Sequence, residues 1–256
     1  MIALPEKTKI WSMFPLSIDI YFELAALLIS IVYWKRLSVS KFFFLPLFLI
    51  FILLIELYGR YLRLELRQPN AWLYNISVPV EFLFYGFIFY NHYARKPFLL
   101  IAKYFLVLFA VFSLGNILFV QGFYKFNTNI LKLGSFFMIL LSCLYFTELL
   151  SKEEPVNFFR EPMVWLTAGV FLFNTGEFFY SLFSDYLIKN HLDRPRRIFA
   201  DINNKLIWVL YTCIIISILC TEKKAQKAWD RSLLAEHWPF LSLVALLFSF
   251  SSCTWT

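Results

Sequence analysis

The sequence predicts an all-α, polytopic transmembrane helix bundle of about seven helices. Of its 256 residues, 60% are hydrophobic and 21% aromatic, and the mean hydropathy is +0.66. This is more apolar surface than a water-soluble domain of this size can bury. Long stretches such as residues 42–55 also carry no charge. The lipid bilayer is therefore expected to be the main solvent of this chain.

Apolar runs of about 20 residues, the length that crosses a bilayer, locate the predicted helices. Trp11 and Trp34 bracket the first run, as expected of indole rings at a membrane interface. The loops between the runs are too short to hold a folded domain. The predicted helices cover residues 14–34, 42–59, 72–91, 98–121, 129–150, 162–186 and 200–220.

Residues 1–221 are thus predicted to form the transmembrane domain, and residues 222–256 a tail that is first basic and then apolar. The first helix carries Asp19 and Glu23 and lacks a small-residue cleavage pattern, so we interpret it as retained and not as a signal peptide. In the tail, Pro239 and the serine-rich end favour a segment that lies in the membrane interface. An additional span is the alternative.

The formal net charge of +7 comes from Lys and Arg residues in short segments between apolar runs. Such segments bind anionic lipid headgroups, and no basic run with interleaved aromatics indicates nucleic acid. Over alternate loops, Lys and Arg number eleven on the side of the tail and ten on the other. Because the basic tail is typical of a cytoplasmic stop, we expect an outside N-terminus and a multi-pass protein of a cell membrane, specifically a bacterial inner membrane.

Polar residues inside the predicted helices are the candidates for function, because charges in a bilayer are costly. Alternate helices run in opposite directions, and nearly all of these groups then lie towards the end at which the first helix begins. Glu23 and Glu81 reach about the midplane, and the opposite half is mostly Phe, Leu, Ile and Val. The candidate ligand-binding residues are Asp19, Glu23, Glu56, Asn75, Glu81, Asn174, Glu177, Asp201 and Lys205.

Helical spacing places these residues in stripes. Ser77, Glu81 and Tyr85 follow a four-residue step, and Asn174, Glu177, Ser181 and Asp185 share a face. In the last helix the stripe is Asp201, Asn204, Lys205, Trp208 and Thr212. Stripes that face one another would enclose an acidic vestibule. The alternative is local pairing, of Glu56 with Arg60 and Asp201 with Lys205, that only fixes helix packing.

Enzyme motifs are missing from the sequence. It has no GxSxG elbow, no HExxH and no glycine-rich phosphate loop. His92, His191 and His237 fall in predicted loops or the tail, and His191 with Asp193 is interpreted as a solvated pair. We therefore predict no catalytic residue, no metal site, no cofactor and no enzymatic activity.

Two resemblances bear on function. Asp201 followed by Lys205 at the start of a seventh helix resembles the retinal-binding end of microbial rhodopsins, but a lysine near the membrane edge is more simply a snorkelling cation. The whole span, with stretches such as YNISVPVEFLFYGFIFY from Tyr74 to Tyr90, is similar to uncharacterised bacterial seven-helix membrane proteins. That similarity implies a sensory or regulatory role beside signalling partners.

The leading hypothesis is a non-enzymatic sensor or receptor-like regulatory subunit. An external small ligand, cation or proton would change interactions among Glu23, Glu81, Glu177 and Lys205, and a signalling protein would read the resulting helix shift. A secondary transporter or proton-coupled carrier is the alternative. A membrane-embedded lipid-modifying enzyme ranks third, because it needs a reactive centre.

Overall fold

The computed structural model describes residues 17–152, 157–190 and 197–221. Within these residues all regular structure is helical, which confirms the predicted all-α fold. The predicted C-terminal tail, residues 222–256, lies outside the described residues, and so do His191 and Asp193.

Long helices account for most of the described chain. They coincide with the seven predicted runs to within a few residues. When α5 is counted together with the π-helical turn that follows it, the largest difference is at α3, which continues five residues beyond the predicted end at Gly59. The added turn carries Arg60 and Arg63, whose long side chains can reach the interface from a helix end. The long helices are α1 (Ile18–Val32), α3 (Leu45–Leu64), α4 (Ala71–His92), α5 (Lys96–Gly115), α6 (Thr128–Leu150), α7 (Pro162–Lys189) and α8 (Arg197–Cys220).

Three short helical turns complete the described chain. The turn α2 (Trp34–Leu37) follows α1, a π-helical turn (Asn116–Val120) extends α5, and a 3₁₀ turn (Phe158–Arg160) precedes α7. These turns cover positions where the sequence predicted helix ends or loops.

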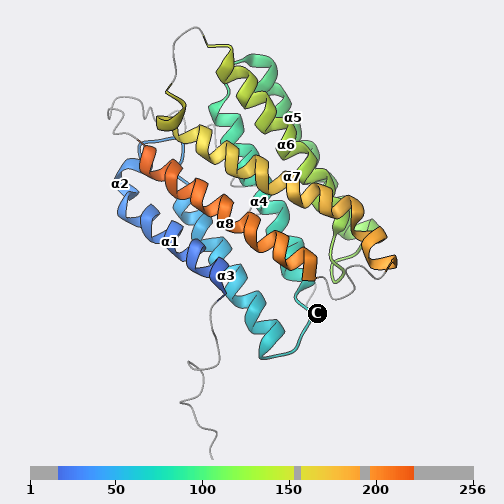
Figure 1. The fold of residues 1–256 in the computed structure, drawn as a ribbon. Helices are drawn as coiled ribbons and strands as arrows, with labels where there is room; N and C mark the ends of the chain where they lie inside the picture. Colours follow the sequence, from blue (N-terminus) through green and yellow to red (C-terminus); the bar gives the residue numbers. More distant parts are fainter. Residues whose placement is uncertain (1–16, 153–156, 191–196, 222–256) are drawn as a thin grey trace, which may run out of the picture.

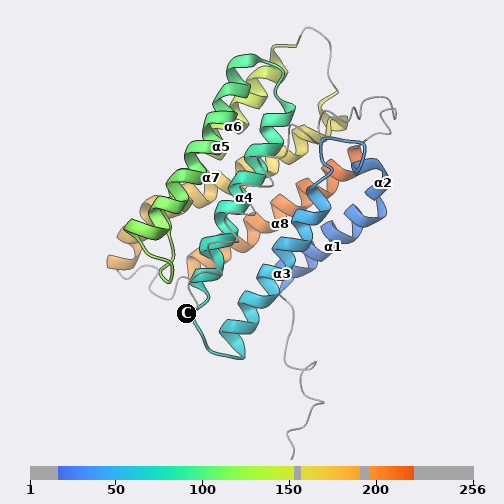
Figure 2. The ribbon, with the colours of Figure 1, turned by 180° about the vertical axis from the view of Figure 1, so that it is seen from behind.

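Successive long helices run in opposite directions (Figure 1 and, from behind, Figure 2). The starts of α1, α4, α6 and α8 therefore lie at the same end of the bundle as the ends of α3, α5 and α7. We call this the acidic end, because most of the predicted polar site residues lie in this half. The other end is called the opposite end.

Helix α4 is the most enclosed element. It packs against α3, α5 and α6, while α8 packs between α1 and α7. Every residue from Phe82 to Phe89 is buried, on all sides of the helix. Glycines let neighbours approach it closely: a Cβ at Gly134 of α6 would lie 2.3 Å from the ring of Phe82. The core of the bundle therefore surrounds α4.

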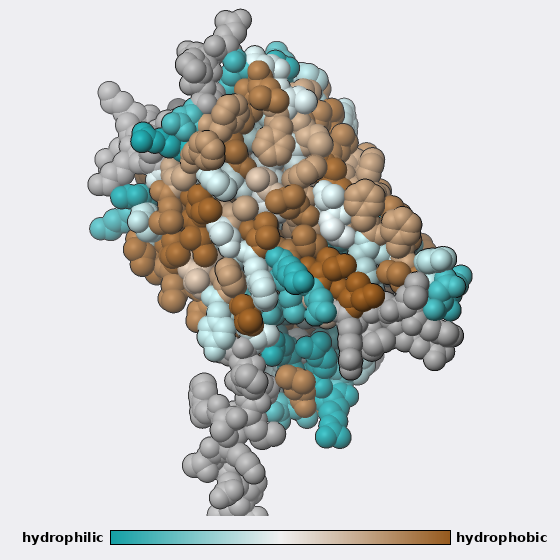
Figure 3. Space-filling model, viewed as in Figure 1, coloured by the Kyte–Doolittle hydropathy of each residue, from teal (hydrophilic) through white to brown (hydrophobic). Residues whose placement is uncertain are grey.

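The chain is a multi-pass integral membrane protein. Among the described residues, five helices are long and apolar enough to cross a membrane: α3, α4, α5 with its π turn, α6 and α8. Figure 3 shows hydrophobic side chains over the middle of one face and hydrophilic ones towards its ends. Helix α1 has only 15 residues, and α7 carries Asn174 and Glu177. That α1 and α7 also span stays a prediction.

Candidate functional site

Four glutamates from four helices are linked by electrostatic interactions in the interior of the bundle. They are Glu23 of α1, Glu56 of α3, Glu81 of α4 and Glu177 of α7. Glu23 and Glu177 are each only 5% exposed, and Glu56 and Glu81 are half-buried. Glu23 interacts electrostatically with Glu56 and Glu81, and Glu81 interacts in turn with Glu56 and Glu177. We call these four side chains the carboxylate cluster.

Asp19 lies beside the carboxylate cluster at the acidic end. The Ser17 hydroxyl donates a hydrogen bond of 2.8 Å to its carboxylate, and the Arg60 guanidinium donates to the same hydroxyl. The predicted local partner of Glu56, Arg60, thus binds across to the segment before α1, while it stays within electrostatic range of Glu56. These contacts join α1 to α3.

Glu56 has a hydrogen-bond partner on α4. The Tyr74 hydroxyl donates to its Oε2 at 3.2 Å. Gly59, one turn after Glu56, makes room for this hydroxyl, since a Cβ there would lie 3.0 Å from it. The carboxylate of Glu56 is therefore held between α3 and α4.

Glu23 differs, because its Oε2 is buried and has no hydrogen-bond partner among the described residues. Next to it on α1, the Phe22 ring stacks on Trp208 of α8, with 6.1 Å between the ring centroids, and the Trp208 Nε1 is also buried without a partner. Tyr211 of α8 is buried and interacts electrostatically with Glu23 and Glu81. Buried polar atoms without partners are rare in folded proteins, so this part of the interior has unused hydrogen-bonding capacity.

Asn174 extends the polar face of α7. Its Nδ2 donates to the Val170 carbonyl at 2.8 Å, within the same helix, and its Oδ1 is buried without a partner in the described chain. Glu177 lies three positions further along the chain, a spacing that puts both side chains on one face of α7.

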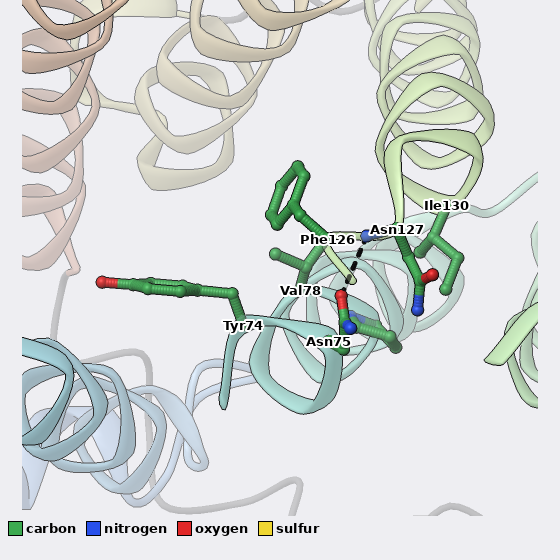
Figure 4. Close-up of a pocket in the computed structure, with 7 residues that line it drawn as sticks. Tyr74, Asn75, Val78, Phe126, Asn127 and Ile130 are labelled. Atoms are coloured by element: carbon green, nitrogen blue, oxygen red, sulfur yellow. Dashed lines mark hydrogen bonds between the residues drawn. The ribbon is translucent and has the colours of Figure 1, made fainter. Parts of the chain in front are cut away.

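Asn75 has a different role from the cluster. Its Nδ2 donates to the carbonyls of Phe123 and Lys125, and its Oδ1 accepts from the Asn127 backbone N–H at 2.9 Å (Figure 4). The recess beside it also contains Tyr74, whose side chain points away from Asn75. The side chain of Asn75 therefore fastens the loop before α6 to α4.

Asp201 and Lys205 are exposed, near the start of α8. The buried face of α8 is formed by Leu210, Tyr211, Ile214 and Ile218. This corrects the predicted stripe in part: Trp208 packs against α1, whereas Asp201, Lys205 and Thr212 are exposed. The physical reason is that the tyrosine and aliphatic face buries more apolar area against α1 and α7. No hydrogen bond in the described chain joins Asp201 or Lys205 to the carboxylate cluster.

Several residues around the site have no counterpart in the sequence prediction. Tyr74, Tyr211 and Phe22 are aromatic residues in aromatic-rich helices, and nothing in the sequence marks them as neighbours of the glutamates. Asn127 is also buried, and its side-chain amide has no hydrogen-bond partner in the described residues. Within the same residues, no three His, Cys, Asp or Glu side chains are arranged to hold a metal ion.

Comparisons with protein-family models, with curated proteins and with solved structures find no match to this chain.

Proposed function

We propose that this chain is a non-enzymatic sensor or receptor-like subunit of a cell membrane, whose carboxylate cluster responds to a proton or a small cation. The observation that supports this most strongly is Glu23, which is 5% exposed and has one carboxylate oxygen without a partner. A carboxylate inside a membrane protein is costly and typically marks a functional site. A proton or cation would supply the missing partner.

The response would be a shift of α1 relative to α8. Glu23 of α1 lies among side chains of three other helices, and α1 packs directly against α8 through Phe22 and Trp208. A bound proton or cation lowers the repulsion between Glu23, Glu56 and Glu81. It therefore favours the helix arrangement in which these side chains lie closer together. A signalling protein in the membrane or cytoplasm would read this shift.

The proposal includes the orientation in which the acidic end faces outwards, in a bacterial inner membrane. Single cysteines at Gln68, Ser151 and Asn190, all exposed, can be tested in intact cells with an impermeant maleimide in a cysteine-free background. We expect labelling at Gln68 and Asn190 and none at Ser151. The reverse pattern would contradict an external ligand and direct the search to a cytoplasmic one.

The helix shift is tested by distances between spin labels. Ile18 of α1 and Ile202 of α8 are exposed near the acidic end, and Val32 and Leu219 form a matched pair near the opposite end. Lowering the pH from ~8 to ~5, or adding Na⁺ or Ca²⁺, should change the Ile18–Ile202 distance by about 2 Å and leave the control pair unchanged. Glu23→Gln should abolish the change.

An unchanged distance under all three conditions would contradict the proposal. So would proton or cation flux in proteoliposomes that is lost in both Glu81→Gln and Glu177→Gln, because flux would assign the same carboxylates to a carrier. Fluxes equal to those of empty vesicles support the sensor.

A further inference from the structure

An apolar groove runs along the membrane face between α5 and α6. It has a volume of about 400 Å³, within the ~300–1,000 Å³ range of small-molecule sites. Its floor is formed by Phe105 and Phe109, which are 3% and 2% exposed, and its rims by Leu108 of α5 and by Leu133 and Phe137 of α6. The groove exists because α5 packs more closely on α4 than on α6.

The position of the groove limits what can fill it. Its lining extends along α5 from Ile101 to Phe112, which is roughly 16 Å at ~1.5 Å per residue. This is about half of the ~30 Å hydrocarbon core, the depth of one lipid leaflet. Because the lining is apolar and the helices cross the membrane, water and polar ligands gain nothing there, whereas an acyl chain fits both the length and the chemistry.

The charges near the mouth of the groove indicate the kind of lipid. Where α5 begins and α6 ends, Glu148 accepts hydrogen bonds from the backbone N–H groups of Ala94 and Arg95, so the two helix ends are in contact. Arg95 and Lys152 are both exposed at this junction. The N-terminus of α5 adds a partial positive charge. Residues 93–127 contain no Asp or Glu, whereas Glu153 and Glu154 follow Lys152 in the sequence.

We propose that the α5–α6 groove binds an acyl chain of an anionic phospholipid, whose phosphate lies at Arg95 and Lys152. The acyl chain covers Phe105 and Phe109, and the phosphate pairs with the exposed side chains of Arg95 and Lys152, beside which the Glu148 carboxylate is already hydrogen-bonded to backbone N–H groups. This site is independent of the carboxylate cluster, which lies in the interior of the bundle.

The test uses the purified full chain in nanodiscs that contain a trace of phosphatidylglycerol with a photoactivatable group in its acyl chain, and the same measurement with phosphatidylcholine. Cross-linked peptides are located by mass spectrometry. We expect cross-links on residues 104–112 and 133–137, with phosphatidylglycerol favoured by about five-fold for each cation.

Matched variants separate the groove from general lipid contact. Leu108→Trp fills the groove and should remove these cross-links, whereas Leu54→Trp, at an equally exposed position on α3, should not. Arg95→Gln with Lys152→Gln should reduce phosphatidylglycerol labelling to the phosphatidylcholine level. Lys103→Gln is the control, because Lys103 lies two residues from Phe105 and so on the other side of α5.

Equal labelling by the two lipids, or labelling spread evenly over α3 and α5, would overturn the proposal. A photoactivatable residue at position 108 that cross-links to residues 238–255 or to a second copy of the chain, in place of lipid, would also overturn it.

Discussion

Two glutamates with the same burial, in opposite halves of the bundle, have opposite surroundings. Glu148 near the end of α6 accepts hydrogen bonds of 2.9 Å from the Ala94 N–H and 3.3 Å from the Arg95 N–H. Glu23 of α1 is equally buried, at 5% exposure, but one of its oxygens has no partner in the described chain.

The difference teaches that burial alone does not separate structural from functional carboxylates. A buried carboxylate that holds two backbone N–H groups stabilises a loop. One that is surrounded by other carboxylates and lacks a partner is a cost to the fold and a candidate for ligand binding. We therefore interpret Glu148 as a structural residue that stabilises the opposite end of the bundle. We interpret the carboxylate cluster as the site that responds to a ligand.

The largest effect is expected at Glu148. Glu148→Gln loses the charge and one of two acceptors, and leaves a backbone N–H without a partner, so the free energy of unfolding should fall by about 2–4 kcal/mol. Unfolding in mixed micelles measures it. A change below about 0.5 kcal/mol would mean that the contacts with Ala94 and Arg95 do not stabilise the fold.

Asn75 should give the next largest loss. It makes hydrogen bonds with three backbone groups of residues 123–127, and Asn75→Ala should lower the free energy of unfolding by about 2–3 kcal/mol. Asn203→Ala is a matched control, because Asn203 is half-buried and forms no hydrogen bond with the described residues. Equal losses in the two variants would contradict the role of Asn75 in fastening the loop.

Lys41 provides a smaller, pH-dependent effect at the opposite end. Its ammonium donates to the Asn91 carbonyl at 2.5 Å. Partial burial, and then the charge of Lys152, lower its pKa below the ordinary value of 10.5. In the window between the lowered pKa and 10.5 the unfolded chain binds more protons, so stability should rise with pH there.

The control for this effect is Lys41→Gln, which should flatten the pH dependence between the lowered pKa of Lys41 and its ordinary value. Thermal unfolding across this window tests it. The same slope in the wild type and in Lys41→Gln would assign the effect to other groups.

The sequence was sufficient for the fold, because apolar runs such as residues 42–55 have few alternatives to a membrane helix. The sequence also marks Glu23, Glu56, Glu81 and Glu177 as candidates, since charged residues stand out in such runs, and their role as a site stays a prediction. The structure links these four side chains by pairwise electrostatic interactions.

Other features depend on contacts between distant residues. The role of Asn75 depends on carbonyl groups 48 and 50 residues away. The rotation of α8 was not predictable, because polar residues such as Asp201 and aromatic residues such as Tyr211 occur on more than one of its faces. Glu148 was visible in the sequence as a polar residue, but its partners are backbone groups that no side-chain pattern reveals.

The smallest expected effect tests the central claim most directly. Glu23→Gln replaces a buried carboxyl group whose Oε2 has no hydrogen-bond partner in the described chain. The free energy of unfolding should therefore stay within about 1 kcal/mol of the wild-type value, or rise above it. The measurement is made beside Glu148→Gln in the same micelles. A loss at Glu23 as large as the loss at Glu148 would contradict the account, because it would show that Glu23 is a fastened structural carboxylate.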